Sequence, residues 1–571
     1  MNSAALSPEH RAWSAGRMAT ETFDVLVVGG GITGTGAALD AATRGLSVAL
    51  VEAADYAAGA SSKSSKLIHG GLRYLEMLDF GLVREALTER GLLLTKLAPH
   101  LVKPVSFLWP LTHRVWERPY VGAGLLLYDT MGGRRAVPRA RHLSRTRALR
   151  LAPALRPDAL VGAVQFYDAQ EDDARMVVCV ARTAAAHGAA LATSMPMVGM
   201  VTSNGRVTGI RARDLLTGAD LEIKARHVVQ ATGAWTSAAA GQDLRVRPSK
   251  GVHIVVPRDR IAMGAGLLTR TEKSVLFVIP WGDHWLIGDT DTQWRHDPAS
   301  PAASHADIEY LLAKVNRMLI EPLTPADIEG VFAGLRPLVA AGEGADTTRL
   351  SREHTVDSSV PGLSVIAGGK FTTYRVMARD LIDAAAADLQ AASGGQRTVI
   401  GASRTQDVPL TGAAGYAGLL AARQQIAADT GLPVSVVERL LGRYGSDIDG
   451  LLGLIATRPA LAQPVPGSGG YLGAEIVYAC SHEGALRLDD VLSRRTRTTI
   501  ETRDRGLASA PHAAALMAAQ CGWDEDRADA EVARYRELIG AELAGEAQPD
   551  DLGAYQAKAG TLRLREVGHG R

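Results

Sequence analysis

The chain has 571 residues and a formal net charge of +1, and 46% of its residues are hydrophobic and 22% charged. These values are typical of a globular protein of about three or four domains, and they exclude a disordered chain and a protein that binds nucleic acid through bulk charge. The three cysteines, Cys179, Cys480 and Cys521, show no C-x-x-C or metal-ligand spacing. We therefore expect no disulfide framework, no iron–sulfur cluster and no metal site.

Residues 1–22 are polar and rich in alanine and serine, and they lack the apolar core of a secretory signal. We expect a flexible N-terminal tail here, with the globular part beginning at Phe23. No run of about 18 apolar residues occurs in the sequence, so we expect no membrane-spanning helix.

A dinucleotide-binding pattern follows in residues 24–34. An apolar strand pattern leads directly into G-x-G-x-x-G, formed by Gly29, Gly31 and Gly34. Gly29 allows the chain to turn, Gly31 leaves space for a pyrophosphate, and Gly34 allows the next helix to lie close to the strand. The free N–H groups of that helix would bind the pyrophosphate. Glu52 closes the next apolar run, where an acid accepts ribose hydroxyls and disfavours a 2′-phosphate, so we expect FAD or NAD rather than NADP.

Two segments between residues 58 and 150 are unusual in composition. Residues 58–76 are rich in serine and glycine and also contain cations, which indicates a loop folded around a ligand. Residues 134–150 contain seven arginines and no acid. This second segment is either a solvated basic surface or a docking surface.

Strand patterns continue through the middle of the chain. A hairpin is predicted around Asn204-Gly205, and the strand after it ends at Gly233, where a dinucleotide-binding sheet returns to its cofactor. Residues 249–340 alternate between apolar and polar, as an antiparallel sheet does. No second G-x-G-x-x-G occurs in a strand–helix context, so we expect a single bound nucleotide.

The last part of the chain has two patterns. Residues 362–375 repeat the order of strand, glycine turn and helix, which gives a second helix N-terminus with free N–H groups. Beyond about Thr405 the strand patterns cease and helical patterns follow, which predicts a separate helical domain.

Six motifs are distributed along the chain: Gly-Gly-Gly-Ile-Thr-Gly at 29–34, Ser-Ser-Lys-Leu-Ile-His-Gly-Gly-Leu-Arg-Tyr-Leu-Glu at 64–76, Lys-Gly-Val-His-Ile-Val-Val-Pro at 250–257, Gly-Asp-Thr-Asp-Thr at 288–292, Gly-Leu-Arg-Pro-Leu at 334–338 and Gly-Gly-Lys-Phe-Thr-Thr-Tyr-Arg at 368–375. Together they resemble the FAD-dependent, aerobic glycerol-3-phosphate dehydrogenases. The resemblance extends into the helical domain at Arg494-Arg495-Thr496-Arg497.

The resemblance implies an α/β fold. A glutathione-reductase-type FAD-binding domain would be interleaved with a mostly antiparallel β substrate domain in residues 23–404 and followed by an all-helical C-terminal domain in residues 405–571. The substrate portion would occupy roughly 98–160 and 245–345.

The resemblance also implies oxidation of sn-glycerol 3-phosphate to dihydroxyacetone phosphate by hydride transfer to FAD, with electrons passed to a membrane quinone. Such an enzyme would be a peripheral homodimer on the cytoplasmic face of the inner cell membrane, and otherwise cytoplasmic. Two alternatives remain open: an oxidase that uses oxygen at the same site, and a non-catalytic FAD-binding redox sensor.

The resemblance places six side chains around the substrate: His253, Arg336 and Lys370 as catalytic residues, and Arg73, Tyr74 and Arg352 as binding residues. The imidazole is the candidate base because it accepts a proton near pH 7, and paired donors on the arginines suit a phosphate. The residues expected to bind the cofactor are Gly29, Gly31, Gly34, Glu52, Ser61, Ser65, Lys66, Leu67, Gly233, Gly369 and Thr372.

Overall fold

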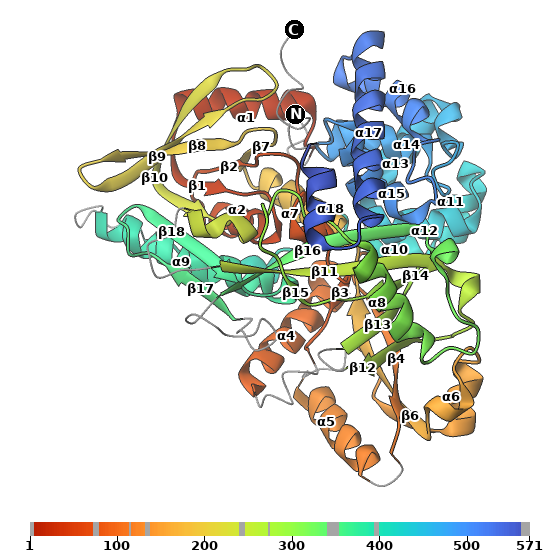
Figure 1. Cartoon of the computed structure of the whole chain (residues 1–571). Coiled ribbons are helices and arrows are strands. Elements are labelled where there is room, and N and C mark those ends of the chain that lie inside the picture. Colours follow the sequence, from red (N-terminus) through yellow and green to blue (C-terminus); the bar gives the residue numbers. More distant parts are fainter. Residues whose placement is uncertain are drawn as a thin grey trace.

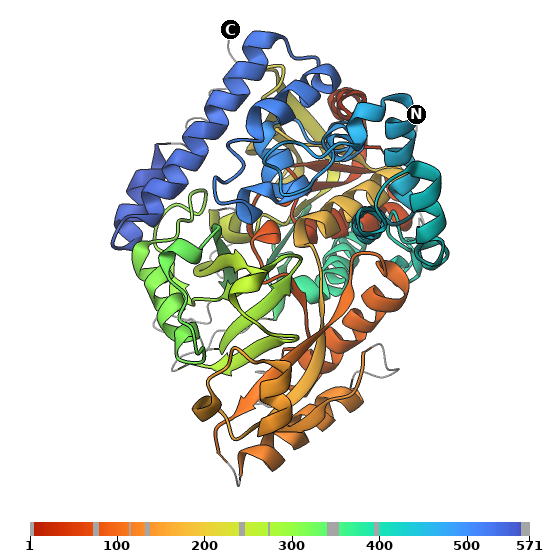
Figure 2. The same ribbon diagram turned by 90° about the vertical axis from the view of Figure 1, so that its right-hand side faces the viewer.

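The computed structural model describes residues 5–71, 79–113, 116–131, 137–238, 246–271, 275–339, 353–392 and 399–560. Two β-sheets and a bundle of C-terminal helices make up this part of the chain. Figure 1 shows the first sheet at the upper left, the second sheet below it and the bundle at the upper right. In Figure 2 the last helices (blue) extend from the top of the molecule down to the second sheet and its helix (green).

The first sheet is built around β1 (Thr22–Val28), which lies between β2 (Val48–Val51) and β10 (Asp220–Gln230), and all three strands run parallel. The side chains of Val25–Val28 are buried, as the near-continuous apolar run of a central parallel strand requires. The sheet is completed by β7 (Ala190–Ala192), β8 (Met197–Ser203), β9 (Arg206–Arg213), β17 (His354–Asp357) and β18 (Leu363–Gly368).

The predicted hairpin is confirmed between β8 and β9. Asn204 and Gly205 form its turn with φ angles of 50° and 75°, and positive φ at both positions is what a type I′ two-residue hairpin turn needs. The hairpin extends the first sheet beyond β10.

Three helices cover the face of the first sheet that carries the largest apolar core. They are α2 (Ile32–Thr43), α7 (Asp173–Ala186) and α9 (Tyr374–Ala392), and α2 packs against both of the others. Small residues on α2 permit this close packing, because a Cβ on Gly36 would lie 3.0 Å from the Tyr374 ring of α9.

The second sheet is mostly antiparallel, as the alternating pattern predicts. Its long strands β11 (Val246–Pro257) and β16 (Gly330–Val339) pair along ten residues. The other strands are β3 (Leu67–Ile68), β4 (Lys103–Leu111), β5 (Arg141–Ser144), β6 (Gly162–Gln170), β12 (Gly266–Arg270), β13 (Val275–Trp281), β14 (His284–Gly288) and β15 (Thr292–Gln293). Because β6 pairs with β4 over its whole length, the second sheet extends past the expected boundary at residue 160.

The helices of this region are α4 (Phe80–Leu92), α5 (Glu117–Met131), α6 (Arg145–Leu151) and α8 (His305–Asn316). Helix α4 continues directly into a π-helical turn at Leu93–Leu97. Figure 1 shows α5 and α6 together at the lower end of the molecule.

The C-terminal helical domain is confirmed. Its helices are α10 (Tyr416–Ala421), α11 (Arg423–Thr430), α12 (Val434–Tyr444), α13 (Ile448–Thr457), α14 (Gly473–His482), α15 (Thr498–Glu501), α16 (Ala510–Cys521), α17 (Glu525–Glu546) and α18 (Asp551–Ala559). Two apolar clusters form its core. No helix in the described part of the chain combines the length and apolar character needed to cross a membrane.

The prediction of a flexible tail at residues 1–22 is wrong for most of that segment, because Pro8–Thr20 forms helix α1 against the first sheet. Arg11 explains the docking: its guanidinium lies 2.7 Å from the carboxylate of Asp214 and donates to the carbonyl of Thr193 at 2.9 Å. Ser7 caps the helix by accepting the N–H of His10. Because polar side chains make these contacts, the segment lacks the hydrophobic periodicity by which a helix is predicted from sequence.

Candidate active site

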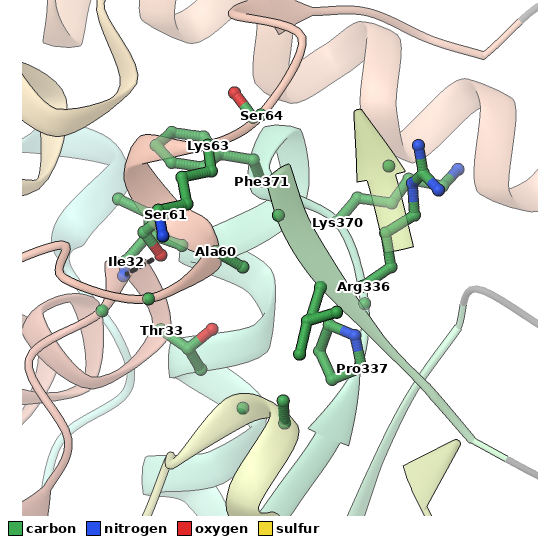
Figure 3. A pocket seen from close by; sticks show the side chains of 18 of the residues that line it. Ile32, Thr33, Ala60, Ser61, Lys63, Ser64, Arg336, Pro337, Lys370 and Phe371 are labelled. Atoms are coloured by element: carbon green, nitrogen blue, oxygen red, sulfur yellow. Dashed lines mark hydrogen bonds between the residues drawn. The ribbon is translucent and has the colours of Figure 1, made fainter. Parts of the chain in front are cut away.

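A cavity of about 1,100 Å³ lies between the two sheets. Its volume exceeds the range of roughly 300–1,000 Å³ that is usual for small-molecule sites, so it has room for a dinucleotide together with a small substrate. Figure 3 shows Ile32 and Ser61 on one side of the cavity and Arg336 and Lys370 on the other.

The glycine turn has the geometry expected for a pyrophosphate site. Gly29 has a φ of +114°, and a Cβ there would lie 2.5 Å from the carbonyl oxygen of Ala231. A Cβ on Gly34 would lie 1.9 Å from the carbonyl oxygen of Gly29, so the helix can approach the strand only with glycine here. Gly31 lines the cavity beside Ser61, at the start of α2. The turn therefore keeps side chains away from the N-terminus of α2, where a pyrophosphate would bind.

Glu52 lines the same end of the cavity but also holds the backbone around it. Its carboxylate accepts the N–H of Gly30 at 2.6 Å and the N–H of Ala54 at 2.8 Å. Burial raises the pKa of Glu52, and these two N–H groups act in the opposite direction. The acid thus fixes the glycine turn, a role that the sequence analysis did not assign.

The loop at residues 61–66 connects the glycine turn to the second sheet. Ser61 Oγ accepts the N–H of Ile32 at 3.0 Å, and Ser65 Oγ lies 2.9 Å from Nε2 of His253. Lys66, which was predicted to bind the cofactor, is not among the residues that line the cavity: it is fully buried, and its Nζ lies 2.9 Å from Asp173. The ammonium of Lys66 donates to the carbonyl of Ser62 and to Asp173, and these bonds hold the loop.

His253 is a buried, neutral imidazole at the centre of the cavity wall. Its ring is 2% exposed and stacks on Phe332 with the ring centres 4.9 Å apart. Burial lowers the pKa of His253 to about 4. The nearby charge of Asp289 raises this pKa, and that of Arg336 lowers it further. Nδ1 has no hydrogen-bond partner among the described residues. The ring therefore stays neutral at pH 7 and can accept a proton.

Arg336 lies in β16 and extends across Gly251 of β11, where a Cβ would come within 2.6 Å of the guanidinium. The guanidinium contacts the carboxylate of Asp289, lies 3.9 Å from Asp291 and donates to the carbonyl of Thr290 at 3.2 Å. Neither aspartate was predicted as a site residue, although both belong to the Gly-Asp-Thr-Asp motif that begins at the last residue of β14.

Lys370 precedes the short 3₁₀ turn Phe371–Thr373 and lines the cavity. Gly369 has a φ of +87°, and a Cβ there would lie 2.4 Å from the Met377 side chain, so the turn requires glycine. Thr372 Oγ1 accepts the N–H of His69 at 3.1 Å, which ties this turn to the loop beyond β3.

The remaining predicted site residues divide into two groups. Leu67 and Gly233 line the cavity, and Gly233 has a φ of +58°. Arg73, Tyr74 and Arg352 lie outside the described residues.

Comparisons with known proteins agree with this geometry. Residues 24–384 match the family described as FAD dependent oxidoreductase, and residues 403–528 match the C-terminal domain of alpha-glycerophosphate oxidase. The chain is 52% identical over 567 residues to the glycerol-3-phosphate dehydrogenase of Mycobacterium leprae, which covers 98% of this chain and 95% of that protein. It is 36% identical over 560 residues to the mitochondrial glycerol-3-phosphate dehydrogenase of Homo sapiens, and the match covers 93% of this chain and 75% of that protein. The solved glycerol-3-phosphate dehydrogenase of Bacillus halodurans, complexed with FAD, superposes with a TM-score of 0.75 at 28% identity and covers 95% of this chain and 99% of that chain.

Proposed function

The chain belongs to the FAD-dependent glycerol-3-phosphate dehydrogenases, and we propose that it passes the electrons from glycerol 3-phosphate to a membrane quinone. It is an FAD-dependent oxidoreductase that converts glycerol 3-phosphate to dihydroxyacetone phosphate. The strongest support is the similarity to a glycerol-3-phosphate dehydrogenase over 98% of this chain. The cavity agrees with it, because a glycine turn, a neutral histidine and two cations line the same space.

In this proposal His253 is the base. Oxidation of the secondary alcohol removes the C2 hydrogen as hydride and the hydroxyl hydrogen as a proton. Bound FAD supplies the acceptor for the hydride. The neutral imidazole takes the proton, and its stacking on Phe332 and its contact with Ser65 hold the ring in one orientation.

Arg336 and Lys370 bind the phosphate or the developing alkoxide in this proposal. Both lie on the side of the cavity opposite Ile32 and Ser61, and His253 lines the same cavity, so an anionic substrate bound there would meet both cations and the base. Asp289 keeps the guanidinium of Arg336 in place before substrate arrives. Charge-assisted hydrogen bonds to a phosphate contribute about 1.5–3 kcal/mol each, which is enough for two or three of them to select a phosphorylated alcohol.

A quinone dissolved in the bilayer requires the protein to reach the membrane surface, and we propose that the lower end of the molecule does so. The described arginines of the 134–150 segment, Arg139, Arg141, Arg145, Arg147 and Arg150, are all exposed. Three leucines interspersed with these arginines, Leu143, Leu149 and Leu151, pack against the core of the second sheet. The segment therefore provides charge but not apolar contact.

Apolar contact is available on the neighbouring helix α5. Its exposed side chains include Trp116 just before its first residue, Tyr120 and Leu127 on the same face, and Leu126, which is 63% exposed. Aromatic and aliphatic residues beside arginines are the composition of a surface that lies in the lipid headgroup region. Figure 1 places α5 and α6 at the same end of the molecule.

Liposome sedimentation tests this surface. Each basic residue near an anionic bilayer contributes about 1 kcal/mol, so changing Arg141, Arg147 and Arg150 to Glu should weaken vesicle binding by about 100-fold or more. The matched control changes Arg458, Arg503 and Arg536, three exposed arginines of the helical domain, and should bind normally. Loss of binding by the control triple instead would place the membrane face on the helical domain.

The acceptor is tested by mixing substrate-reduced enzyme with quinone or with oxygen and following flavin absorbance. A quinone-linked dehydrogenase should reoxidise far faster with quinone. The alternative is an oxidase, which the match of residues 403–528 to the C-terminal domain of alpha-glycerophosphate oxidase favours. Faster reoxidation by oxygen, with stoichiometric hydrogen peroxide, would support that alternative.

A further inference from the structure

Three arginines of the helical domain are buried beside the cofactor cavity. Arg494 and Arg495 belong to the π-helical turn Asp490–Thr496, and Arg497 follows it. All three are at most 8% exposed, yet none of these three lines the cavity. These arginines belong to the motif at 494–497, which is part of the sequence resemblance but has no role in the proposed catalysis.

Arg497 reaches from the helical domain to the start of α7. Its Nη2 donates to Asp172 at 2.6 Å and also contacts Asp173, and its Nη1 donates to the carbonyl of Ser62 at 3.3 Å. Asp173 is fully buried. Burial alone would raise the pKa of Asp173, but Lys66 and Arg497 lower it below its usual value.

Asp173 in turn holds the loop at residues 61–66. Its carboxylate accepts the N–H of Ser64 at 3.0 Å, the hydroxyl of Ser64 at 2.7 Å and the ammonium of Lys66 at 2.9 Å. The next residue along, Ser65, contacts His253. Hydrogen bonds therefore connect Arg497 through Asp173 to Ser64, and the peptide backbone connects Ser64 to Ser65, which contacts the base.

Arg494 and Arg495 act on the other flank of the same cavity wall. Both guanidiniums contact Asp55, at 2.5 Å and 2.7 Å, and this carboxylate is 2% exposed. Asp55 lies three residues after Glu52, in the segment where the N–H of Ala57 donates to the carbonyl of Gly30. The paired arginines thus fix the segment that surrounds the glycine turn.

We propose that Arg497 is a positioning residue of the active site, through which the helical domain fixes the serine loop against both the cofactor and His253. The planar guanidinium contacts Asp172, Asp173 and Ser62 through a rigid fork of N–H donors, a geometry that the compact ammonium of a lysine does not reproduce. The helical domain therefore supports the wall of the cofactor site without lining the cavity itself. The inference about His253 rests on its proposed role as base, whereas the inference about the cofactor does not.

The test compares FAD release from the holoenzymes of Arg497→Lys and wild type, followed by the fluorescence of free flavin. Release from Arg497→Lys should be at least tenfold faster. The matched control is Arg439→Lys, because Arg439 binds Glu475 through two bonds of 2.9 Å and 2.7 Å inside the helical domain. Its release rate should stay within twofold of wild type.

A second readout separates positioning from general destabilisation. The acid limb of flavin reduction by glycerol 3-phosphate should move upward from about pH 4 in Arg497→Lys, because a loosened loop admits water to His253. The control should keep the wild-type profile. Because FAD release is measured without substrate, a wrong assignment of substrate or base would leave the first readout intact.

The proposal would be overturned if Arg497→Lys released FAD at the wild-type rate. It would also be overturned if Arg439→Lys released FAD as fast as Arg497→Lys does. If Arg497→Lys does not fold, Ser64→Ala decides the question from the loop side, since it removes the 2.7 Å bond to Asp173. Threefold or faster release is expected from Ser64→Ala, and an unchanged rate would overturn the proposal.

Discussion

Arg336→Ala is the substitution whose consequence follows most directly from the cavity. It removes a cation that we place on the substrate phosphate, and a charge-assisted hydrogen bond of this kind contributes about 1.5–3 kcal/mol. At about 1.4 kcal/mol per factor of ten, this loss alone lowers kcat/KM by roughly 10- to 150-fold.

The neighbouring carboxylate increases the effect. Without the guanidinium, the negative charge of Asp289 faces the incoming phosphate unopposed by Arg336. Two unit charges roughly 6–8 Å apart repel by about 2–3 kcal/mol at an effective dielectric constant of 20. The two effects together amount to about 3.5–6 kcal/mol, so the single variant should lose about 300- to 20,000-fold in kcat/KM.

The assay is steady-state reduction of a soluble dye by glycerol 3-phosphate, on protein whose flavin content has first been matched to wild type. Adding Asp289→Asn to Arg336→Ala should restore about 30- to 100-fold, because the repulsion of about 2–3 kcal/mol is removed. Arg336→Ala with kcat/KM within threefold of wild type would refute the assignment of Arg336. A double variant no better than the single one would refute the role given to Asp289.

Three further results are expected. Gly34→Ala should purify without flavin, since its Cβ would lie 1.9 Å from the carbonyl oxygen of Gly29; a fully yellow protein would contradict the pyrophosphate site. The limiting rate of flavin reduction should stay level from pH 8 to about pH 5 and halve near pH 4, because the depressed pKa of His253 keeps the ring neutral, and an acid limb at pH 6.5 would argue against this base. Arg11→Met should destabilise the protein by about 3 kcal/mol, because it leaves the carboxylate of Asp214 without its buried guanidinium; an unchanged melting temperature would contradict the docking of α1.

Much of the fold follows from local patterns in the sequence. The buried run of β1, the glycine turn and the Asn204-Gly205 hairpin each depend on residues within one short segment, so the sequence contains the whole signal. The second sheet and the helical domain likewise show the periodicity of their elements. Helix α1 was missed because polar contacts, rather than an apolar stripe, attach it to the sheet.

The candidate site was predicted less completely, because its contacts join distant parts of the chain. Asp289 and Arg336 are separated by 47 positions, and Arg497 and Asp173 by 324. Neither spacing leaves a pattern that sequence reading can detect. The ion pair of Lys66 could not be predicted for the same reason, since its partner Asp173 lies 107 positions away.

Anaerobic titration of the purified holoenzyme with glycerol 3-phosphate tests the central claim most directly. We predict that about one equivalent of substrate bleaches the flavin absorbance with stoichiometric formation of dihydroxyacetone phosphate, because the reaction is a two-electron transfer from C2 to bound FAD. Deuterium at C2 should slow the bleaching. A flavin that remains oxidised in excess glycerol 3-phosphate, or that is reduced equally well by glycerol, would contradict the account.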